Sequence, residues 1–260
     1  MHTDMTGKVA LVTGASRGIG AAVARAFRSA GARVVISARD AEALARLADE
    51  LRDGQTLALP TDVSDAKAVA EMVERVVSEF GRLDFACNNA AGGGHPPTPL
   101  AKIPIAAFDS MQAISLRGVF LSMHAEIPAI IRSGGGAIVN MSSTAGLQGV
   151  GGLSSYVAAK HGVEGLTKVA ALDYAGVGVR VNAVAPGPIL TDNLKRAGTA
   201  AQQAAAAAMP LRRVGQPEEV AAAVLWLCSD QSGFITGTTL TIDGGKLAGT
   251  PPFQVKAGPR

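Results

Sequence analysis

Short apolar runs alternate with longer amphipathic segments along the whole chain. The runs are rich in β-branched residues and almost free of charge, as in strands that helices cover on both faces of a parallel sheet. Seven strands are predicted, over residues 8–13, 33–37, 56–59, 84–88, 137–142, 179–185 and 238–242. Helices are predicted over residues 21–30, 41–52, 66–80, 107–132, 155–175 and 217–229, with a kink or break expected at Pro128. The alternation predicts a single α/β domain over residues 1–260, with a doubly wound parallel sheet of Rossmann type.

Three segments fall outside this alternation. Residues 92–104 form a loop rich in glycine and proline, and residues 246–260 form a tail of similar composition. Residues 187–213 contain no strand pattern but do contain an alanine-rich run. Because ligands bind at the carboxyl ends of strands in such sheets, we expect residues 187–213 to form a substrate lid above those ends.

Composition narrows the classes of function. The 260 residues carry a net charge of +3 with basic residues scattered along the chain, so neither a nucleic acid nor a membrane surface is an expected partner. No apolar run approaches the ~18 residues that a membrane span needs, and the N-terminus does not resemble a signal peptide. Two cysteines in apolar stretches are expected to be buried, reduced thiols. We therefore expect a cytoplasmic protein, and the cysteine and histidine spacing predicts no metal site.

The segment Thr13–Gly20, of sequence TGASRGIG, joins the first strand to the first helix. A pyrophosphate needs free backbone N–H groups and a helix N-terminus pointing at it. Gly14 can form the tight turn, Gly18 allows close approach to the phosphates, and Gly20 allows the helix to pack near the strand. The turn is therefore predicted to bind a dinucleotide, through Gly14, Ser16, Arg17, Gly18, Ile19 and Gly20.

The same segment also matches the G-x-S-x-G elbow of serine hydrolases, with Ser16 as the nucleophile. That alternative is weaker because the turn follows the first strand. It also requires a histidine at the tip of a later strand. Of the downstream histidines, His124 and His161 lie in helical patterns, and only His95 lies in a loop.

The cofactor's ribose is expected to meet the end of the second strand, about twenty residues beyond the turn. No carboxylate occupies that strand end, where Arg39 is found instead, with Arg17 nearby in the glycine turn. Two guanidinium groups favour a 2′-phosphate, so NADP(H) is the predicted cofactor. Asp40 follows one position later, and NAD(H) would be the alternative if its carboxylate turned inward.

Tyr156 and Lys160 lie four residues apart on one face of a predicted helix. A phenol with a pKa of about 10 is too weak a base at neutral pH, and a neighbouring ammonium group is expected to lower that pKa. The pair could then exchange a proton with a carbonyl oxygen. Ser143, just past a strand end, could hold that oxygen against the phenol.

With these motifs, the chain from Gly7 to Gly245 resembles the short-chain dehydrogenase/reductase family, including members of the 3-oxoacyl-carrier-protein reductase and glucose 1-dehydrogenase types. The resemblance implies that Tyr156 is the general acid/base, that Lys160 lowers its pKa and holds the nicotinamide ribose, and that Ser143 orients the substrate. It also implies cofactor contacts in three further segments, made by Asp62 and Val63 at the adenine, Asn89 and Ala90 at the adenosine ribose, and Pro186, Gly187, Ile189 and Thr191 at the nicotinamide.

Two departures from the family pattern are visible. Asn89-Ala90-Ala91 replaces the usual Asn-Ala-Gly, with Gly92 one place later, which is expected to shift the loop. Ser115 replaces an asparagine that usually helps to hold a water beside the lysine, so Ser115 is a doubtful fourth member of the catalytic set.

The predicted activity is hydride transfer between NADP(H) and a secondary alcohol or ketone. Small carbonyl and alcohol compounds are the expected partners, and the resemblance implies a homotetramer. The alternative from another class is a regulator that senses nicotinamide dinucleotides without catalysis. Such a protein would not need Ser143, Tyr156 and Lys160 together, and this chain has all three.

Overall fold

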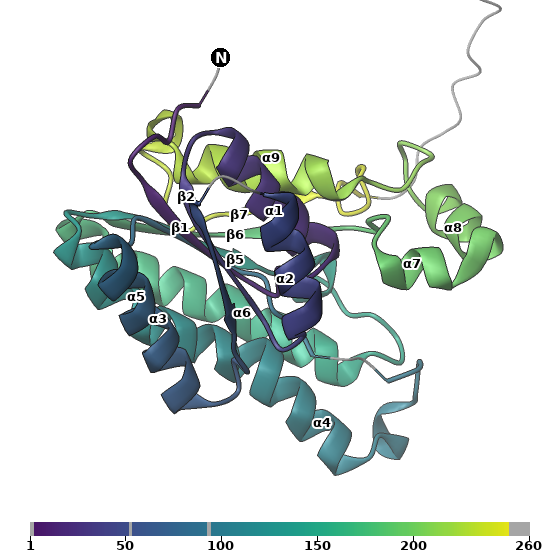
Figure 1. Cartoon of the computed structure of the whole chain (residues 1–260). Helices are drawn as coiled ribbons and strands as arrows, with labels where there is room; N and C mark the ends of the chain where they lie inside the picture. Colours follow the sequence, from purple (N-terminus) through teal and green to yellow (C-terminus); the bar gives the residue numbers. More distant parts are fainter. Residues whose placement is uncertain (1–2, 52–53, 93–94, 250–260) are drawn as a thin grey trace, which may run out of the picture.

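The computed structural model describes residues 3–51, 54–92 and 95–249, and parts of the expected loop 92–104 and tail 246–260 lie outside those ranges. Seven parallel strands form one sheet in the order β3-β2-β1-β4-β5-β6-β7 (Figure 1). The strands are β1 (Val9–Thr13), β2 (Arg33–Ala38), β3 (Thr56–Pro60), β4 (Phe85–Asn88), β5 (Gly136–Met141), β6 (Val179–Pro186) and β7 (Thr239–Ile242). The predicted doubly wound sheet is therefore confirmed.

Helices cover both faces of this sheet. They are α1 (Gly18–Ser29), α2 (Ala41–Glu50), α3 (Ala66–Phe80), α4 (Ile105–Gln112), α5 (Gly118–Arg132), α6 (Ser154–Tyr174), α7 (Asp192–Arg196), α8 (Gly198–Ala207) and α9 (Pro217–Cys228). Alternate residues of each strand point to opposite faces, so Ala10 and Val12 join a core with α1, α2 and α9. Val9 and Leu11 join a second core with α3, α5 and α6.

The long helical region after the fourth strand differs from the prediction. It stays helical from Ile105 to Arg132, through Pro128, so the expected break at that proline is wrong. The irregularity is instead a π-helical turn at Ala113–Arg117, between α4 and α5. By length and composition alone this helix could cross a membrane, but that is a weak indication, because half of its apolar stretch is buried within the domain. It packs on α3 and on the sheet as a core helix does.

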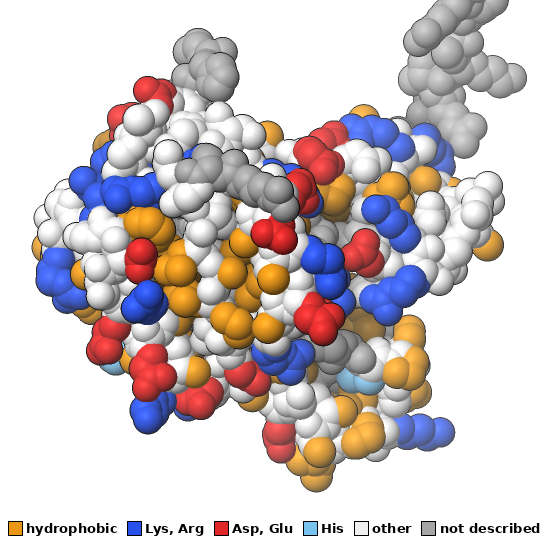
Figure 2. Space-filling model, viewed as in Figure 1, with side chains coloured by type: hydrophobic (Ala, Val, Ile, Leu, Met, Phe, Trp, Pro, Cys, Tyr) orange, Lys and Arg blue, Asp and Glu red, His pale blue; other side chains and the backbone are white. Residues whose placement is uncertain are grey.

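Residues after β6 leave the sheet and form α7 and α8, which project to one side of it (Figure 1). A single parallel bridge between Ile189 and Gly215 closes the base of this excursion. The segment predicted to lack strands is thus largely helical. Basic and acidic side chains are interspersed over the face seen in Figure 2.

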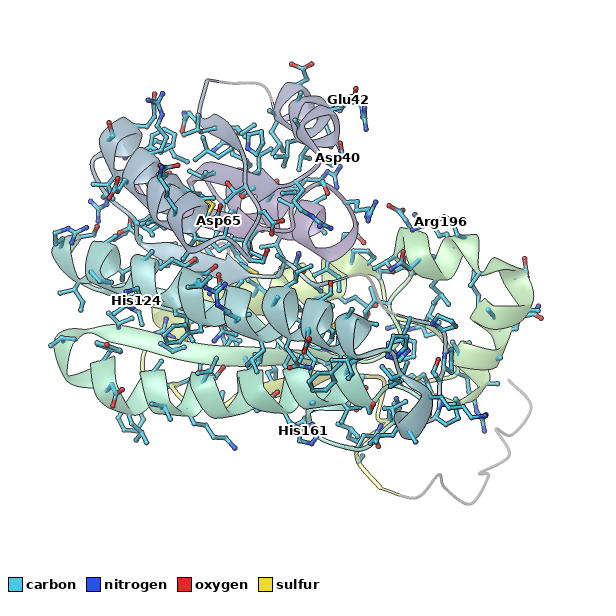
Figure 3. All side chains as sticks on the ribbon, turned by 90° about the horizontal axis from the view of Figure 1, so that it is seen from below. Asp40, Glu42, Asp65, His124, His161 and Arg196 are labelled. Carbon is cyan, nitrogen blue, oxygen red and sulfur yellow. The ribbon has the colours of Figure 1, made fainter. Side chains whose placement is uncertain are left out.

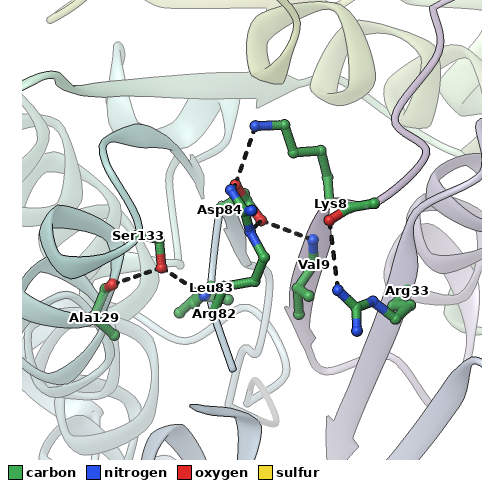
Figure 4. Close-up of polar contacts among 9 residues, drawn as sticks. Lys8, Val9, Arg33, Arg82, Leu83, Asp84, Ala129 and Ser133 are labelled. Atoms are coloured by element: carbon green, nitrogen blue, oxygen red, sulfur yellow. Dashed lines mark hydrogen bonds and ion pairs between the residues drawn. The ribbon is translucent and has the colours of Figure 1, made fainter. Parts of the chain in front are cut away.

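At the amino ends of the central strands, Asp84 ties β4 to β1 (Figure 4). Its buried carboxylate accepts from the backbone N–H of Val9 at 2.9 Å and from Nε and Nη2 of Arg82, and it pairs with Lys8 at 3.3 Å. This brace lies at the amino ends of the strands. The carboxyl ends, where the site lies, are held by other contacts.

Candidate active site

Two glycines of the turn, Gly14 and Gly20, have no room for a side chain. Gly14 and Gly18 have φ angles of +64° and +57°, in the left-handed region that favours glycine. A Cβ on Gly14 would lie 2.8 Å from Ala90 Cα, and a Cβ on Gly20 would lie 2.5 Å from Asn89 Nδ2. Helix α1 begins at Gly18 and no side chain caps it. Its first N–H groups are therefore available to phosphate oxygens, so these residues fit a bound dinucleotide.

Asn89 fixes the turn from the neighbouring strand. Its Nδ2 donates to the carbonyl oxygens of Thr13 and Gly14, at 3.0 Å each. The Thr13 hydroxyl accepts from the backbone N–H groups of Asn89 and Ala90, at 3.1 and 3.2 Å. The carboxyl ends of β1 and β4 are thereby locked together. Sequence reasoning missed Thr13, because nothing local to it indicates a partner 76 residues away.

A cavity of about 250 Å³ brings together eight of the predicted cofactor residues. It is lined by Gly14, Ser16, Arg17, Arg39, Asp40, Asp62, Val63, Asn89 and Ala90, among others. Arg17 and Arg39 line one cavity, as the NADP(H) prediction requires. Asp40 caps α2, where its carboxylate accepts from the Ala43 N–H at 3.0 Å, and Figure 3 shows it at the start of that helix. Two hydrogen bonds from Ser64, with a smaller contribution from Arg39, hold the pKa of Asp62 below its usual value.

No histidine of the described residues is placed to act as a general base for Ser16. In the described ranges, the ring nitrogens of His95 and His161 bond to groups near Tyr156, and His124 stacks on Phe120. His161 lies on the outer side of α6, away from the sheet (Figure 3). None of the three forms a hydrogen bond with Ser16, so the hydrolase alternative has no triad.

Ser143, Tyr156 and Lys160 come from two elements. Ser143 follows β5, where its hydroxyl accepts from the Ala145 N–H at 3.2 Å. Tyr156 lies in the first turn of α6, and Lys160 lies one turn further on. The Lys160 ammonium is 5.7 Å from the centre of the tyrosine ring and donates to the carbonyl oxygen of Met141 at 2.6 Å. The lysine is thus anchored to the end of β5, next to the serine.

Burial is the largest influence on the pKa values of Tyr156 and Lys160. It raises the pKa of Tyr156 above its usual value, although a hydrogen bond with Ser143 acts in the opposite direction. That direction is the reverse of the lowering expected from the lysine. Burial also lowers the pKa of Lys160 to about 8, against the influence of Glu164. At neutral pH the phenol is therefore protonated, which suits a proton donor.

Ser115 lies in the π-helical turn and is fully buried. Its hydroxyl accepts from the backbone N–H of Gly92 at 3.0 Å and donates to the sulfur of Met111 at 3.2 Å. Neither bond involves Tyr156 or Lys160. The two departures from the family pattern therefore meet in one contact. Ser115 accepts the backbone N–H of Gly92, the glycine that comes one place later than in the family.

The segment after β6 runs across the glycine turn. Pro186 is the last residue of β6, and a Cβ on Gly187 would lie 2.9 Å from Asp243 Cα. Thr191 approaches the turn closely, because a Cβ on Gly18 would lie 3.3 Å from its Cγ2. Thr191 therefore lies against Gly18, the first residue of α1.

The loop that contains His95 lies beside Tyr156. The His95 Nε2 and the Ser155 hydroxyl are 2.8 Å apart, and the Thr98 N–H donates to the Gly152 carbonyl at 3.0 Å. His95 and Ser155 are 60 residues apart in the chain, so nothing local in the sequence indicates their contact. Within the described residues, no group of three or more His, Cys, Asp or Glu side chains could hold a metal ion.

Comparison with known proteins agrees with this geometry. Residues 14–246 match the family model described as enoyl-(acyl carrier protein) reductase. The chain belongs to the short-chain dehydrogenase/reductase family, whose members are oxidoreductases that use NAD(P)(H).

Three relatives illustrate the range of substrates. The chain is 42% identical to a cyclohexanol dehydrogenase of an Acinetobacter species, over 94% of this chain and 96% of that protein. It is 43% identical to the cis-4-hydroxycyclohexanecarboxylate dehydrogenase of Sinomonas cyclohexanicum, over 93% and 97%. It is also 39% identical to the 3-oxoacyl-[acyl-carrier-protein] reductase of Thermotoga maritima, over 93% and 98%.

Proposed function

We propose that this protein interconverts a secondary alcohol and a ketone with NADP(H), and that Tyr156 transfers the proton. The observation that carries the proposal is the buried Lys160 ammonium, 5.7 Å from the ring of Tyr156 and bonded to the end of β5 beside Ser143. The bound nicotinamide supplies or accepts the hydride. During reduction, Ser143 orients the carbonyl oxygen and the protonated phenol of Tyr156 donates to it.

Replacing the phenol tests this role. Tyr156→Phe removes only the hydroxyl, so we expect turnover to fall by at least ~100-fold while cofactor affinity changes little. Cofactor fluorescence measures the binding, and absorbance of the reduced nicotinamide measures turnover. Full turnover in this variant would exclude Tyr156 as the proton donor. Cofactor binding without turnover of any compound by the wild-type protein would favour the alternative of a non-catalytic sensor.

The preference for NADP(H) rests on Arg17 and Arg39 lining one cavity while Asp40 caps α2. Each guanidinium can form a charge-assisted hydrogen bond to a 2′-phosphate. Arg39→Ala is expected to raise KM for NADPH by ~10-fold or more and to leave KM for NADH nearly unchanged. An equal loss with both coenzymes, or a wild-type enzyme that prefers NADH, would contradict the assignment.

For the substrate we propose a cyclic secondary alcohol and its ketone. Two of the relatives above are named for six-membered ring alcohols, and the apolar side chains of Leu147 and Leu153 lie in the segment between Ser143 and Tyr156. A coupled assay over ring alcohols, 3-oxoacyl esters, sugars and steroids is the test. Faster turnover of an acyclic class than of every ring compound would refute this choice.

A cytoplasmic homotetramer is the proposed state of the protein. Exposed apolar side chains on α5 and α6 support the assembly, since Phe120, Val169 and Leu172 are 49%, 57% and 83% exposed in the single chain. Light scattering on the purified protein measures the mass. A monomer at micromolar concentration would contradict the proposal.

A further inference from the structure

Helix α5 carries a buried carboxyl group that the proposed chemistry does not use. Glu126 is completely buried, and its Oε2 accepts from Asn88 Nδ2 at 3.0 Å. Its second oxygen, Oε1, has no hydrogen-bond partner, and no basic side chain of the described residues forms an ion pair with it. An ionised carboxylate in such a place would be costly.

Asn88, at the end of β4, also has a buried oxygen without a hydrogen-bond partner. Its Nδ2 donates both to Glu126 and to Asn140 Oδ1, the latter at 3.1 Å, but its own Oδ1 is buried and accepts from no donor. Asn140 Nδ2 in turn donates to the Thr167 hydroxyl at 2.9 Å. A chain of polar side chains therefore crosses an otherwise apolar core from α5 through β4 and β5 to α6.

Both orphaned atoms are acceptors, and both belong to planar groups already joined by one hydrogen bond. A single proton on Glu126 Oε1 supplies the donor that both of them lack, whereas an unsatisfied buried polar atom costs about 1–3 kcal/mol. We propose that Glu126 is kept as a neutral acid that donates from Oε1 to Asn88 Oδ1, and that this reciprocal acid–amide pair positions the end of β4 for cofactor binding. Burial acts in the same direction, because it raises the pKa of Glu126 to about 7.

The surrounding elements offer no charge that would stabilise the anion. On β4, Cys87 is a buried thiol whose own pKa burial raises, with Glu126 as a further cause. On β6, Arg180 donates to the carbonyls of Ile235 and Ser229, and β5 has no titratable residue. On α6, Lys160 donates to Met141 and Glu164 bonds to Thr239. The remaining charged side chains on α3 and α5 are exposed, namely Lys67, Glu71, Glu74, Arg75, Glu79, His124 and Arg132.

The pair lies one residue from the groups that shape the site. Asn88 precedes Asn89, which holds the glycine turn through Thr13 and Gly14. Asn140 is paired with Asn88 across the two strands, and it precedes Met141, the acceptor of Lys160. When Glu126 loses its proton, Asn88 loses a donor and faces a buried anion. The clamp on the glycine turn then loosens, so Glu126 is a positioning residue.

Glu126→Gln tests the pair, because an amide at this position can both accept from Asn88 and donate to it at every pH. A glutamate whose folded pKa is raised contributes stability at low pH that is lost as the pH rises from its unfolded value of 4.5 to about 7. The melting temperature of the variant relative to wild type is therefore expected to rise by about 6–12 °C between pH 4.5 and 7.5 and then stay level. Affinity for NADPH and NADH, measured by fluorescence, is expected to fall at least threefold above pH 7 in wild type but not in the variant.

Glu74→Gln is the matched control, since it removes an exposed carboxylate from the adjoining helix α3. It should follow wild type in both measurements. Parallel pH curves for wild type and Glu126→Gln would overturn the neutral acid. A difference in melting temperature without a difference in cofactor affinity would overturn the positioning role. If Glu126→Gln does not fold, Glu126→Met is measured instead. Its melting temperature relative to wild type must rise between pH 4.5 and 7.5, and its cofactor affinity must not fall above pH 7. A Glu126→Met protein whose two pH curves parallel those of wild type refutes the proposal. The thermal measurement needs no activity, so its outcome is independent of the proposed reaction.

Discussion

Lys160 should make the folded protein less stable at neutral pH, although the proposed reaction needs it. Its side chain is 1% exposed, and burial lowers its pKa from 10.5 to about 8. At pH 7 the group is still protonated, so folding must place an ammonium in the interior without an ion pair among the described residues. Replacing it with methionine, which has a similar length and no charge, is expected to stabilise the cofactor-free protein.

The size of the effect follows from linkage. The difference between 10.5 and about 8 corresponds to a penalty of about 3 kcal/mol at pH 7. Loss of the hydrogen bond to Met141 offsets about 1 kcal/mol of it. The expected net gain for Lys160→Met is therefore about 2 kcal/mol, or roughly 4–8 °C in melting temperature for a chain of this size.

The sign of the pH dependence distinguishes this cause from general repacking. A lysine with a depressed folded pKa imposes its full penalty below about pH 8, and the penalty shrinks as the pH rises toward 10.5. The stability advantage of Lys160→Met should therefore narrow between pH 7 and pH 9.5. Thermal unfolding of both proteins without cofactor at several pH values is the measurement.

Lys168 provides the control. It lies on the same helix and is exposed, so Lys168→Met should change the melting temperature by little at any pH. A Lys160→Met protein that is less stable than wild type at pH 7 would refute the reasoning. So would an advantage that stays constant up to pH 9.5. The variant should also lack turnover, because the phenol loses its neighbouring ammonium.

Three further changes have defined outcomes. Ser115→Ala leaves the half-buried N–H of Gly92 without its acceptor, and we expect a loss of about 1 kcal/mol in unfolding free energy, measured by denaturant titration. Gly20→Ala places a Cβ 2.5 Å from Asn89 Nδ2, so fluorescence titration should show cofactor affinity reduced by ~10-fold or more, with strain of about 1–3 kcal/mol. Because burial raises the pKa of Tyr156, alcohol oxidation should speed up as the pH rises from about 6 to 8, the range in which Lys160 keeps its ammonium, while ketone reduction does not. Steady-state rates at saturating substrate measure both.

Features that are contiguous in the chain could be predicted from it. The glycine turn needs only a strand, three glycines and a helix in succession, and Tyr156 and Lys160 need only the period of one helix. Their places in the fold agree with the structure. The pKa of Tyr156 could not be predicted in the same way. Its direction depends on how much solvent the folded chain removes, and the distance between two residues on a helix does not give that quantity.

Contacts between distant segments of the chain could not be predicted either, for a related reason. Ser115 contacts the backbone N–H of Gly92, which lies 23 residues earlier in a loop. The partner of Asn88 depends on which strand lies beside β4 and in what register. A shift of one residue in a parallel pair would turn Asn140 to the other face of the sheet. The observed register pairs Asn88 with Asn140, which brings Asn89 and Met141 level at the carboxyl edge. The clamp on the glycine turn and the anchor of Lys160 therefore both depend on the register of this one pair of strands.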